Sequence, residues 1–119
     1  MTISIQPWEK SLIQNIEKAI MVANLGFNPM NNGESVIINV PPLTEERRKE
    51  LVKQAKSEAE ESKVGVRNDR KIAMNDVKEL DASEDLKSNL EIDIQEMTDD
   101  HIKKIESILA KKEEEIMTV

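Results

Sequence analysis

The chain has 119 residues, which is enough for one ordinary domain or two small ones. It contains no cysteine, so disulfides and thiolate metal sites are excluded. No apolar run is long enough to span a bilayer and no signal-peptide pattern is present, so we expect a soluble cytoplasmic protein with no membrane partner. The only aromatic residues are Trp8 and Phe27, which argues against single-stranded nucleic-acid binding through stacking.

The net charge of -7 is unevenly distributed along the chain. Residues 1–43 carry a net charge of -1, residues 44–80 a net charge of +1, and residues 81–119 a net charge of -7. The middle segment also holds every arginine of the chain: Arg47, Arg48, Arg67 and Arg70. Guanidinium groups suit phosphate oxygens, so this segment predicts an anionic partner.

The first 40 residues predict a strand, a helix and a second strand. Residues 2–6 alternate apolar and polar side chains as a half-buried strand does. Pro7 suits the first turn of a helix that ends near Gly26, and residues 31–33 read as a loop before a strand at 35–40. The helix has one apolar face, formed by Trp8, Leu12, Ile16, Ala19, Ile20 and Ala23.

Two long helices are predicted after Pro41-Pro42. Thr44 is a candidate N-cap for a helix that extends to Leu80, and Ser83 is a candidate N-cap for the next. The short connection between them predicts an antiparallel hairpin. The first helix is expected to pack through Leu51, Ala55, Ala59, Ser62, Val66, Ala73, Val77 and Leu80. The second is expected to pack through Leu86, Leu90, Ile94, Met97, Ile105, Ile108 and Ile116.

The predicted fold class is therefore α+β and mostly helical. Residues 1–42 form a remnant strand-helix-strand domain, and residues 43–119 form a long antiparallel helical hairpin, an incomplete three-helix bundle. Two amphipathic helices leave one apolar face without a partner, so we expect self-association through the exposed seam.

Two strings in the middle segment resemble bacterial ribosome recycling factors. These are PPLTEERRKEL at residues 41–51 and VRNDR at residues 66–70, and the likeness extends to residues 17–29 and 102–117. The resemblance implies a three-helix bundle with a smaller α/β domain inserted after the first bundle helix. This chain would then begin inside the inserted domain and lack roughly the N-terminal third of the family's length. Met1 is expected to be an internal start or a fragment boundary.

The resemblance also implies a function and a set of contact residues. Family members split the post-termination ribosome together with elongation factor G, do no covalent chemistry and need no cofactor or metal. Their RNA-contacting arginines correspond to Arg48, Arg67 and Arg70, and Lys71 stands where an arginine is usual. Arg67 and Arg70 are three residues apart on a helix, so we expect them to share one face and to meet phosphates of large-subunit ribosomal RNA. The small domain is implicated in meeting elongation factor G.

Plainer interpretations remain open at this stage. Arg67 and Arg70 could pair with Glu61, Asp69 or Asp76 on a solvated face. The hairpin could be a protein-interaction module without an RNA role. An enzyme is not expected, because no glycine-rich phosphate loop, cysteine nucleophile or serine–histidine arrangement is present. His101 is the only histidine and has no second histidine or cysteine with which to hold a metal.

Overall fold

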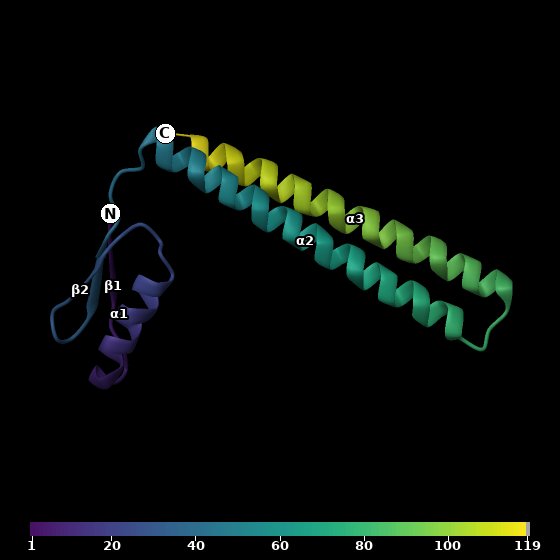
Figure 1. The fold of residues 1–119 in the computed structure, drawn as a ribbon, viewed down its shortest axis with the longest axis horizontal. Helices are drawn as coiled ribbons and strands as arrows, with labels where there is room; N and C mark the ends of the chain where they lie inside the picture. Colours follow the sequence, from purple (N-terminus) through teal and green to yellow (C-terminus); the bar gives the residue numbers. More distant parts are fainter. Residues whose placement is uncertain (119) are drawn as a thin grey trace. The chain divides into compact units, whose positions relative to one another are not determined.

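The computed structural model describes residues 1–118 and divides the chain into two compact units. The first unit comprises Met1–Leu43, and the second begins at Thr44 (Figure 1). The fold is α+β and mostly helical, as predicted. Assigning the two segments to an inserted domain and to two helices of a larger bundle stays a prediction.

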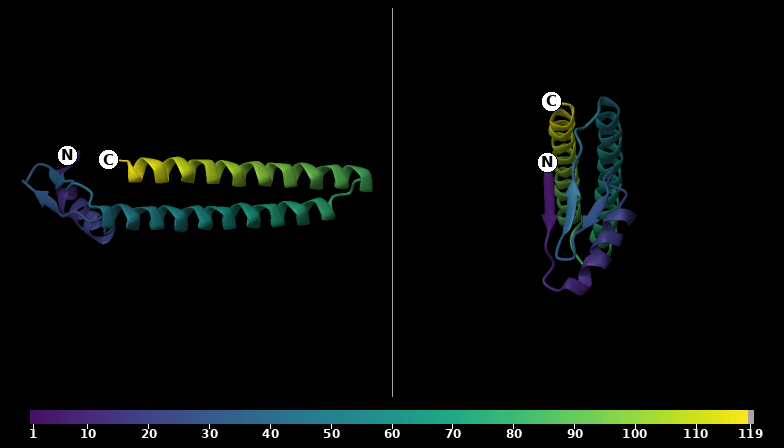
Figure 2. Two further views of the ribbon diagram at one scale, coloured as in Figure 1. Left: turned by 90° about the horizontal axis from the view of Figure 1, so that it is seen from above. Right: turned by 90° about the vertical axis from the view of Figure 1, so that its left-hand side faces the viewer.

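The first unit is a small sheet with one helix against it. The strands are β1 (Thr2–Ile5), β2 (Pro29–Asn31) and β3 (Val36–Asn39), and both pairings are antiparallel in the order β1-β3-β2 (Figure 2). A short 3-10 helix, η1 (Lys10–Leu12), leads into helix α1 (Ile13–Val22). The core is formed by Ile13, Val36 and Ile38, each no more than 4% exposed. β-branched side chains on the central strand and one helix residue therefore hold this unit together.

Three features of this unit differ from the predictions. The helix does not begin at Pro7, because Trp8 is 99% exposed and offers no packing for an earlier turn. Its buried position is Ile13, with Ile16 and Ile20 half-buried, so the face that packs is rotated from the predicted one. Strand β2 was missed, since its proline argued for a loop. Proline is tolerated there because β2 is an edge strand.

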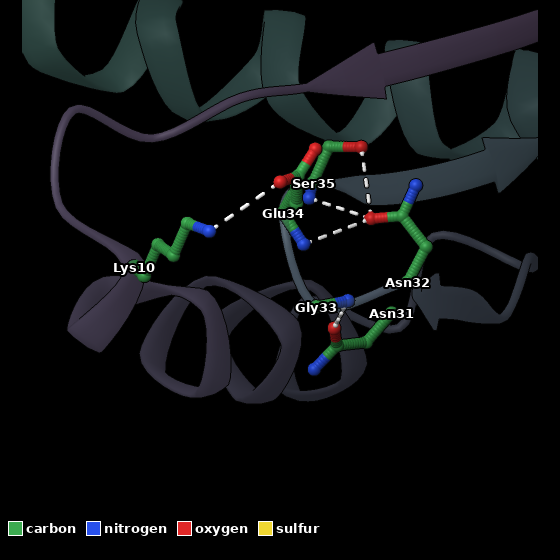
Figure 3. Close-up of polar contacts among 6 residues, drawn as sticks. All are labelled: Lys10, Asn31, Asn32, Gly33, Glu34 and Ser35. Carbon is green, nitrogen blue, oxygen red and sulfur yellow. Dashed lines mark hydrogen bonds and ion pairs between the residues drawn. The ribbon is translucent and has the colours of Figure 1, made fainter.

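The turns of the first unit depend on asparagine and glycine. Helix α1 ends at Val22, and Asn24, just after the C-cap residue Ala23, has a positive φ of 49°, two residues before the predicted stop at Gly26. In the loop between β2 and β3, the Asn32 side-chain oxygen accepts from the backbone N–H groups of Glu34 at 3.0 Å and Ser35 at 2.8 Å (Figure 3). Gly33 has a φ of +87°, which side chains rarely adopt.

The second unit is the predicted hairpin. Helix α2 (Glu45–Glu79) has 35 residues and helix α3 (Glu84–Met117) has 34, and the two lie side by side in both figures of the fold (Figures 1 and 2). Both predicted N-caps are confirmed: the side chain of Thr44 accepts from Arg47 N–H at 3.1 Å, and that of Ser83 from Leu86 N–H at 3.3 Å. Among residues 1–118, no helix has the length and apolarity needed to cross a membrane.

The seam between α2 and α3 is narrower than predicted. Only Ala59, Val77 and Thr98 are buried, and the rest of the seam is half-exposed. Ser62 and Leu80 on α2 are exposed, contrary to the prediction, and so are three of the predicted α3 positions: Leu86, Met97 and Ile108. Within the second unit, these side chains lie outside the contact between α2 and α3. The seam instead includes the polar residues Lys63, Arg70 and Gln95.

Candidate nucleic-acid interface

A row of cations follows one flank of α2, and we call it the cationic stripe. Its members are spaced by three, four or seven residues, so they fall on one side of an α-helix: Lys49, Lys53, Lys56, Lys63, Arg67, Lys71 and Lys78. Most acidic residues of α2 lie off this flank; Glu45 and Glu60 are the exceptions, and they pair with Lys49 and Lys63. From Lys53 to Lys78 the stripe extends for about 38 Å at the helical rise of 1.5 Å per residue.

Part of the stripe pairs with α3 at seven-residue intervals. Lys56 lies 3.4 Å from Glu113, and Lys63 lies 3.3 Å from Glu106. Seven residues further, Arg70 donates to the side-chain oxygen of Gln95 at 2.8 Å. Gln95 in turn donates to Asp99 at 3.0 Å. This ladder fixes the register of the two helices and occupies some of the cations within the hairpin.

Lys63 is the most enclosed of these cations, since its side chain is only 13% exposed. Its hydrogen bond to Glu60 raises the pKa of the ammonium group, burial opposes the rise, and Glu106 adds to it. The pKa stays above the usual lysine value, so Lys63 remains charged at neutral pH. Its charge is directed at two carboxylates and not at solvent.

The four predicted RNA-contacting residues separate into two pairs in the structure. Arg67 and Lys71 are exposed, and neither has an ion pair or hydrogen bond from its side chain to another of residues 1–118. Arg70 is half-buried and donates to Gln95, whereas Arg67 is exposed, and a shared RNA contact of the two arginines stays a prediction. Arg67 and Lys71 are four residues apart on α2, so they are neighbours on the exposed side of the cationic stripe.

Arg48 connects the start of α2 to the end of α3. Its guanidinium donates to the backbone carbonyl of Ile116 and, at 2.8 Å, to that of Thr118. The Ile116 carbonyl lies in the last turn of α3 and Thr118 directly follows the helix, where carbonyls have no helical N–H partner and the dipole is negative. Arg48 therefore acts as a C-terminal cap for α3, and it does so through one of its guanidinium nitrogens, Nη1.

The exposed part of the stripe, which we call the outer row, extends further along α2 than the predicted contact residues Arg67 and Lys71. Lys53 and Lys78 also lie on it, and their side chains make no ion pair within the described residues. The three- and four-residue spacing of the lysines could have revealed them. No cluster of three or more potential metal ligands occurs among residues 1–118.

The fold and the stripe define a class of protein: a helical hairpin joined to a small α/β unit, with one flank suited to a polyanion. The ribosome recycling factor family model matches residues 1–117. The chain therefore belongs to the ribosome recycling factor family.

Curated relatives and solved structures agree with this assignment. The chain is similar to the ribosome-recycling factors of Christiangramia forsetii, with 69% identity over 118 residues, and Flavobacterium johnsoniae, with 58% identity over 121 residues. It covers 64% and 65% of their lengths, while they match 99% of this chain. A solution structure of a ribosome recycling factor is similar with a TM-score of 0.69, 41% identity, and coverage of 99% of this chain and 64% of the other.

A second similar structure is of a recycling factor bound to the ribosome. It contains the Thermus thermophilus ribosome recycling factor and Escherichia coli elongation factor G in models bound to the E. coli post-termination complex. This chain is similar to it with a TM-score of 0.55 and 44% identity, covering 98% of this chain and 65% of the other. The chain thus spans about two thirds of the length of the relatives that it matches.

Proposed function

We propose that this chain binds the large subunit of the post-termination ribosome in the cytoplasm, through phosphates of ribosomal RNA. In this proposal it acts with elongation factor G to promote subunit splitting and performs no covalent chemistry. Family membership supports the setting, and a related recycling factor occurs together with elongation factor G in a post-termination complex. The observation that supports an RNA contact is the outer row of the cationic stripe, where the side chains of Lys53, Arg67, Lys71 and Lys78 are exposed.

The direct contacts are assigned to Arg67 and Lys71. Both are exposed and unpaired, and Lys53 and Lys78 extend the same row in both directions. Arg70 and Arg48 each use one guanidinium nitrogen inside the hairpin, on Gln95 and on the carbonyls of Ile116 and Thr118, so each has less capacity for a phosphate than Arg67 has. These two arginines belong to the predicted set, and their role in the proposal is to hold α2 against α3 behind the contact row.

The test is binding of the 119-residue chain to isolated large ribosomal subunits over a salt series. Each phosphate contact that is lost should reduce the slope of log K against log salt by about one. We expect Arg67→Ala and Lys71→Ala each to weaken binding and flatten the slope. The same measurement on Arg48→Ala and Arg70→Ala shows what the hairpin-bound arginines contribute.

Lys104→Ala is the matched control. Lys104 is an exposed lysine on α3 with no partner among residues 1–118, and it lies seven residues after Met97, on the side of α3 away from the pairs Lys56–Glu113 and Lys63–Glu106. The proposal fails if Lys104→Ala weakens binding as much as Lys71→Ala does. Binding that does not respond to salt or to either stripe variant would identify the hairpin as a protein-interaction module without an RNA role.

A further inference from the structure

The loop between β2 and β3 contains the only asparagine-glycine step of the chain, Asn32-Gly33. When glycine follows asparagine, its backbone nitrogen can attack the side-chain carbonyl carbon of the asparagine and close a five-membered imide. Glycine obstructs this attack least, because it has no Cβ and its backbone is the least restricted. Both residues are exposed, and a Cβ added to Gly33 would meet no atom within 4 Å, so water and hydroxide can reach the step.

Hydrogen bonds within the loop engage both groups that would react (Figure 3). The side-chain oxygen of Asn32 accepts from the backbone N–H groups of Glu34 and Ser35, and from the Ser35 hydroxyl at 3.2 Å. The attacking nitrogen, that of Gly33, donates its hydrogen to the side-chain oxygen of Asn31 at 2.6 Å. This nitrogen becomes a strong nucleophile only after it loses that hydrogen, so the bond to Asn31 bears directly on the reaction.

We propose that Asn32 is a site of spontaneous deamidation, and that the hydrogen bond from Gly33 to Asn31 restrains the reaction in the folded chain. The donors on Asn32 do not oppose the attack, because they would stabilise the negative charge that develops on its side-chain oxygen. The bond to Asn31 does oppose it, because a base has to remove the hydrogen that Asn31 holds. The reaction is therefore slow while strand β2 keeps Asn31 in place and fast once this strand is released.

The reaction needs only water and hydroxide. Hydroxide removes the N–H hydrogen of Gly33, and the nitrogen forms a bond to Cγ of Asn32. The bond from Cγ to the side-chain nitrogen then breaks, and that nitrogen leaves as ammonia with a proton from water, which regenerates the hydroxide. Water opens the imide, at the side-chain carbonyl to give aspartate or at the backbone carbonyl to give isoaspartate. Overall one water is consumed, one ammonia is released, and the chain gains one negative charge.

The two products have different consequences for the small unit. Aspartate fits the loop, because its carboxylate would accept from the same donors as the amide oxygen of Asn32. Isoaspartate adds an atom to the main chain between Asn31 and Gly33, next to the pairing of Asn31 with Val36. Val36 is fully buried, so a changed register there disturbs the core. Isoaspartate also exposes a main-chain carboxylate, which is the group that isoaspartyl methyltransferases esterify with S-adenosylmethionine.

Peptide mapping by mass spectrometry of the 119-residue chain, incubated in mildly alkaline buffer, tests the site. We expect Asn32 to be the first asparagine converted, with isoaspartate detected by enzymatic methyl transfer from S-adenosylmethionine. Conversion should be about five-fold slower in the folded chain than in guanidinium chloride, which is the factor that one hydrogen bond of ordinary net strength gives. Other asparagines are internal controls, because the nitrogen after Asn28 belongs to Pro29 and has no hydrogen, and others lie in helices: Asn15, Asn68, Asn75 and Asn89.

Variants of Asn31 test the restraint. Asn31→Ala removes the acceptor, so it should raise the rate in the folded chain about five-fold and leave the rate in guanidinium chloride unchanged. Asn31→Asp keeps an acceptor for the Gly33 N–H and adds a negative charge beside it, so its rate should not exceed that of the parent chain. Asn28→Ala is the matched control, because it removes an exposed asparagine from the connection between α1 and β2 and should leave the rate unchanged. Hydrogen exchange within Val36–Asn39 verifies that each variant keeps the sheet.

The proposal is overturned if another asparagine is converted before Asn32, or if Asn32 reacts equally fast in the folded and unfolded chains. It is also overturned if Asn31→Ala keeps both the sheet and the parental rate. If Asn31→Ala loosened the sheet, the decision would rest on Asn31→Asp, and a rate above that of the parent chain would exclude Asn31 as the restraint. A parental or lower rate in Asn31→Asp, with Asn28→Ala unchanged, supports the proposal.

Discussion

The two units of this chain bury their apolar residues in different ways. The small unit encloses Ile13, Val36 and Ile38 almost completely, within one sheet and one helix. The hairpin, with nearly twice as many residues, has few buried side chains, and its seam is mostly half-exposed. The small unit therefore depends on a few non-local contacts. The hairpin spreads its stabilisation along two long helices, and its seam side chains are mostly half-exposed within the unit.

The largest expected effect compares one isoleucine in each unit. Ile38→Ala removes a side chain that is 4% exposed, and we expect a cost of about 2–5 kcal/mol to the small unit. Ile105→Ala removes a half-buried seam residue, so the cost to the hairpin should be about half as large. Hydrogen exchange read separately for Val36–Asn39 and for α3 measures each unit by itself. If Ile38→Ala and Ile105→Ala reduced hydrogen-exchange protection equally, each in its own unit, the proposed difference between the two units would be wrong.

A pair of glycine substitutions should change stability in opposite directions. Gly65 lies inside α2, and a Cβ added there meets no atom within 4 Å. Gly65→Ala should therefore stabilise the hairpin by about 1 kcal/mol through helix propensity. Gly33→Ala also meets open space, but its φ of +87° strains any side chain, so it should destabilise the small unit by about 1 kcal/mol.

Chemical denaturation followed by the same local exchange measurement distinguishes the two glycine effects. A loss of stability in Gly65→Ala would mean that the surroundings of Gly65 on α2 are more crowded than the structure shows. A neutral Gly33→Ala would mean that the loop can adopt another turn.

The smallest expected effect is a pH dependence at Lys63. Its pKa in the folded hairpin lies above the ordinary lysine value of 10.5, so its contribution is fully present below that pH. The contribution is lost as pH rises through the higher folded value. Comparing the thermal midpoint of the hairpin between pH 9 and pH 12 should show a shallower decline in Lys63→Met than in the parent chain. Lys103→Met is the control, and an identical decline in both variants would exclude the effect.

The hairpin could be predicted well from the sequence because its signals are local. Thr44 and Ser83 mark the helix starts by their own side-chain hydrogen bonds, and the short polar connection leaves only an antiparallel arrangement. The small unit was predicted less well because its elements depend on partners that are distant in the sequence. β2 is a strand because it pairs with β3, and no local pattern within Pro29–Asn31 predicts a strand.

The candidate site was predicted in part. Residue type and family resemblance identified Arg67 and Lys71, which the structure leaves exposed on α2. The inward turn of Arg70 depends on Gln95 of the other helix, and the use of Arg48 depends on the last carbonyls of α3. Such partners come from register between helices, which no local pattern in α2 encodes.

The contact of Arg48 with the end of α3 has a consequence for how the hairpin assembles. It joins positions 68 and 70 residues apart, whereas the turn joins residues that are adjacent in the chain. Closing so long a loop before the helices have paired would cost about 4 kcal/mol of chain entropy. We therefore expect the helices to pair from the turn toward their free ends, with the contact of Arg48 forming late.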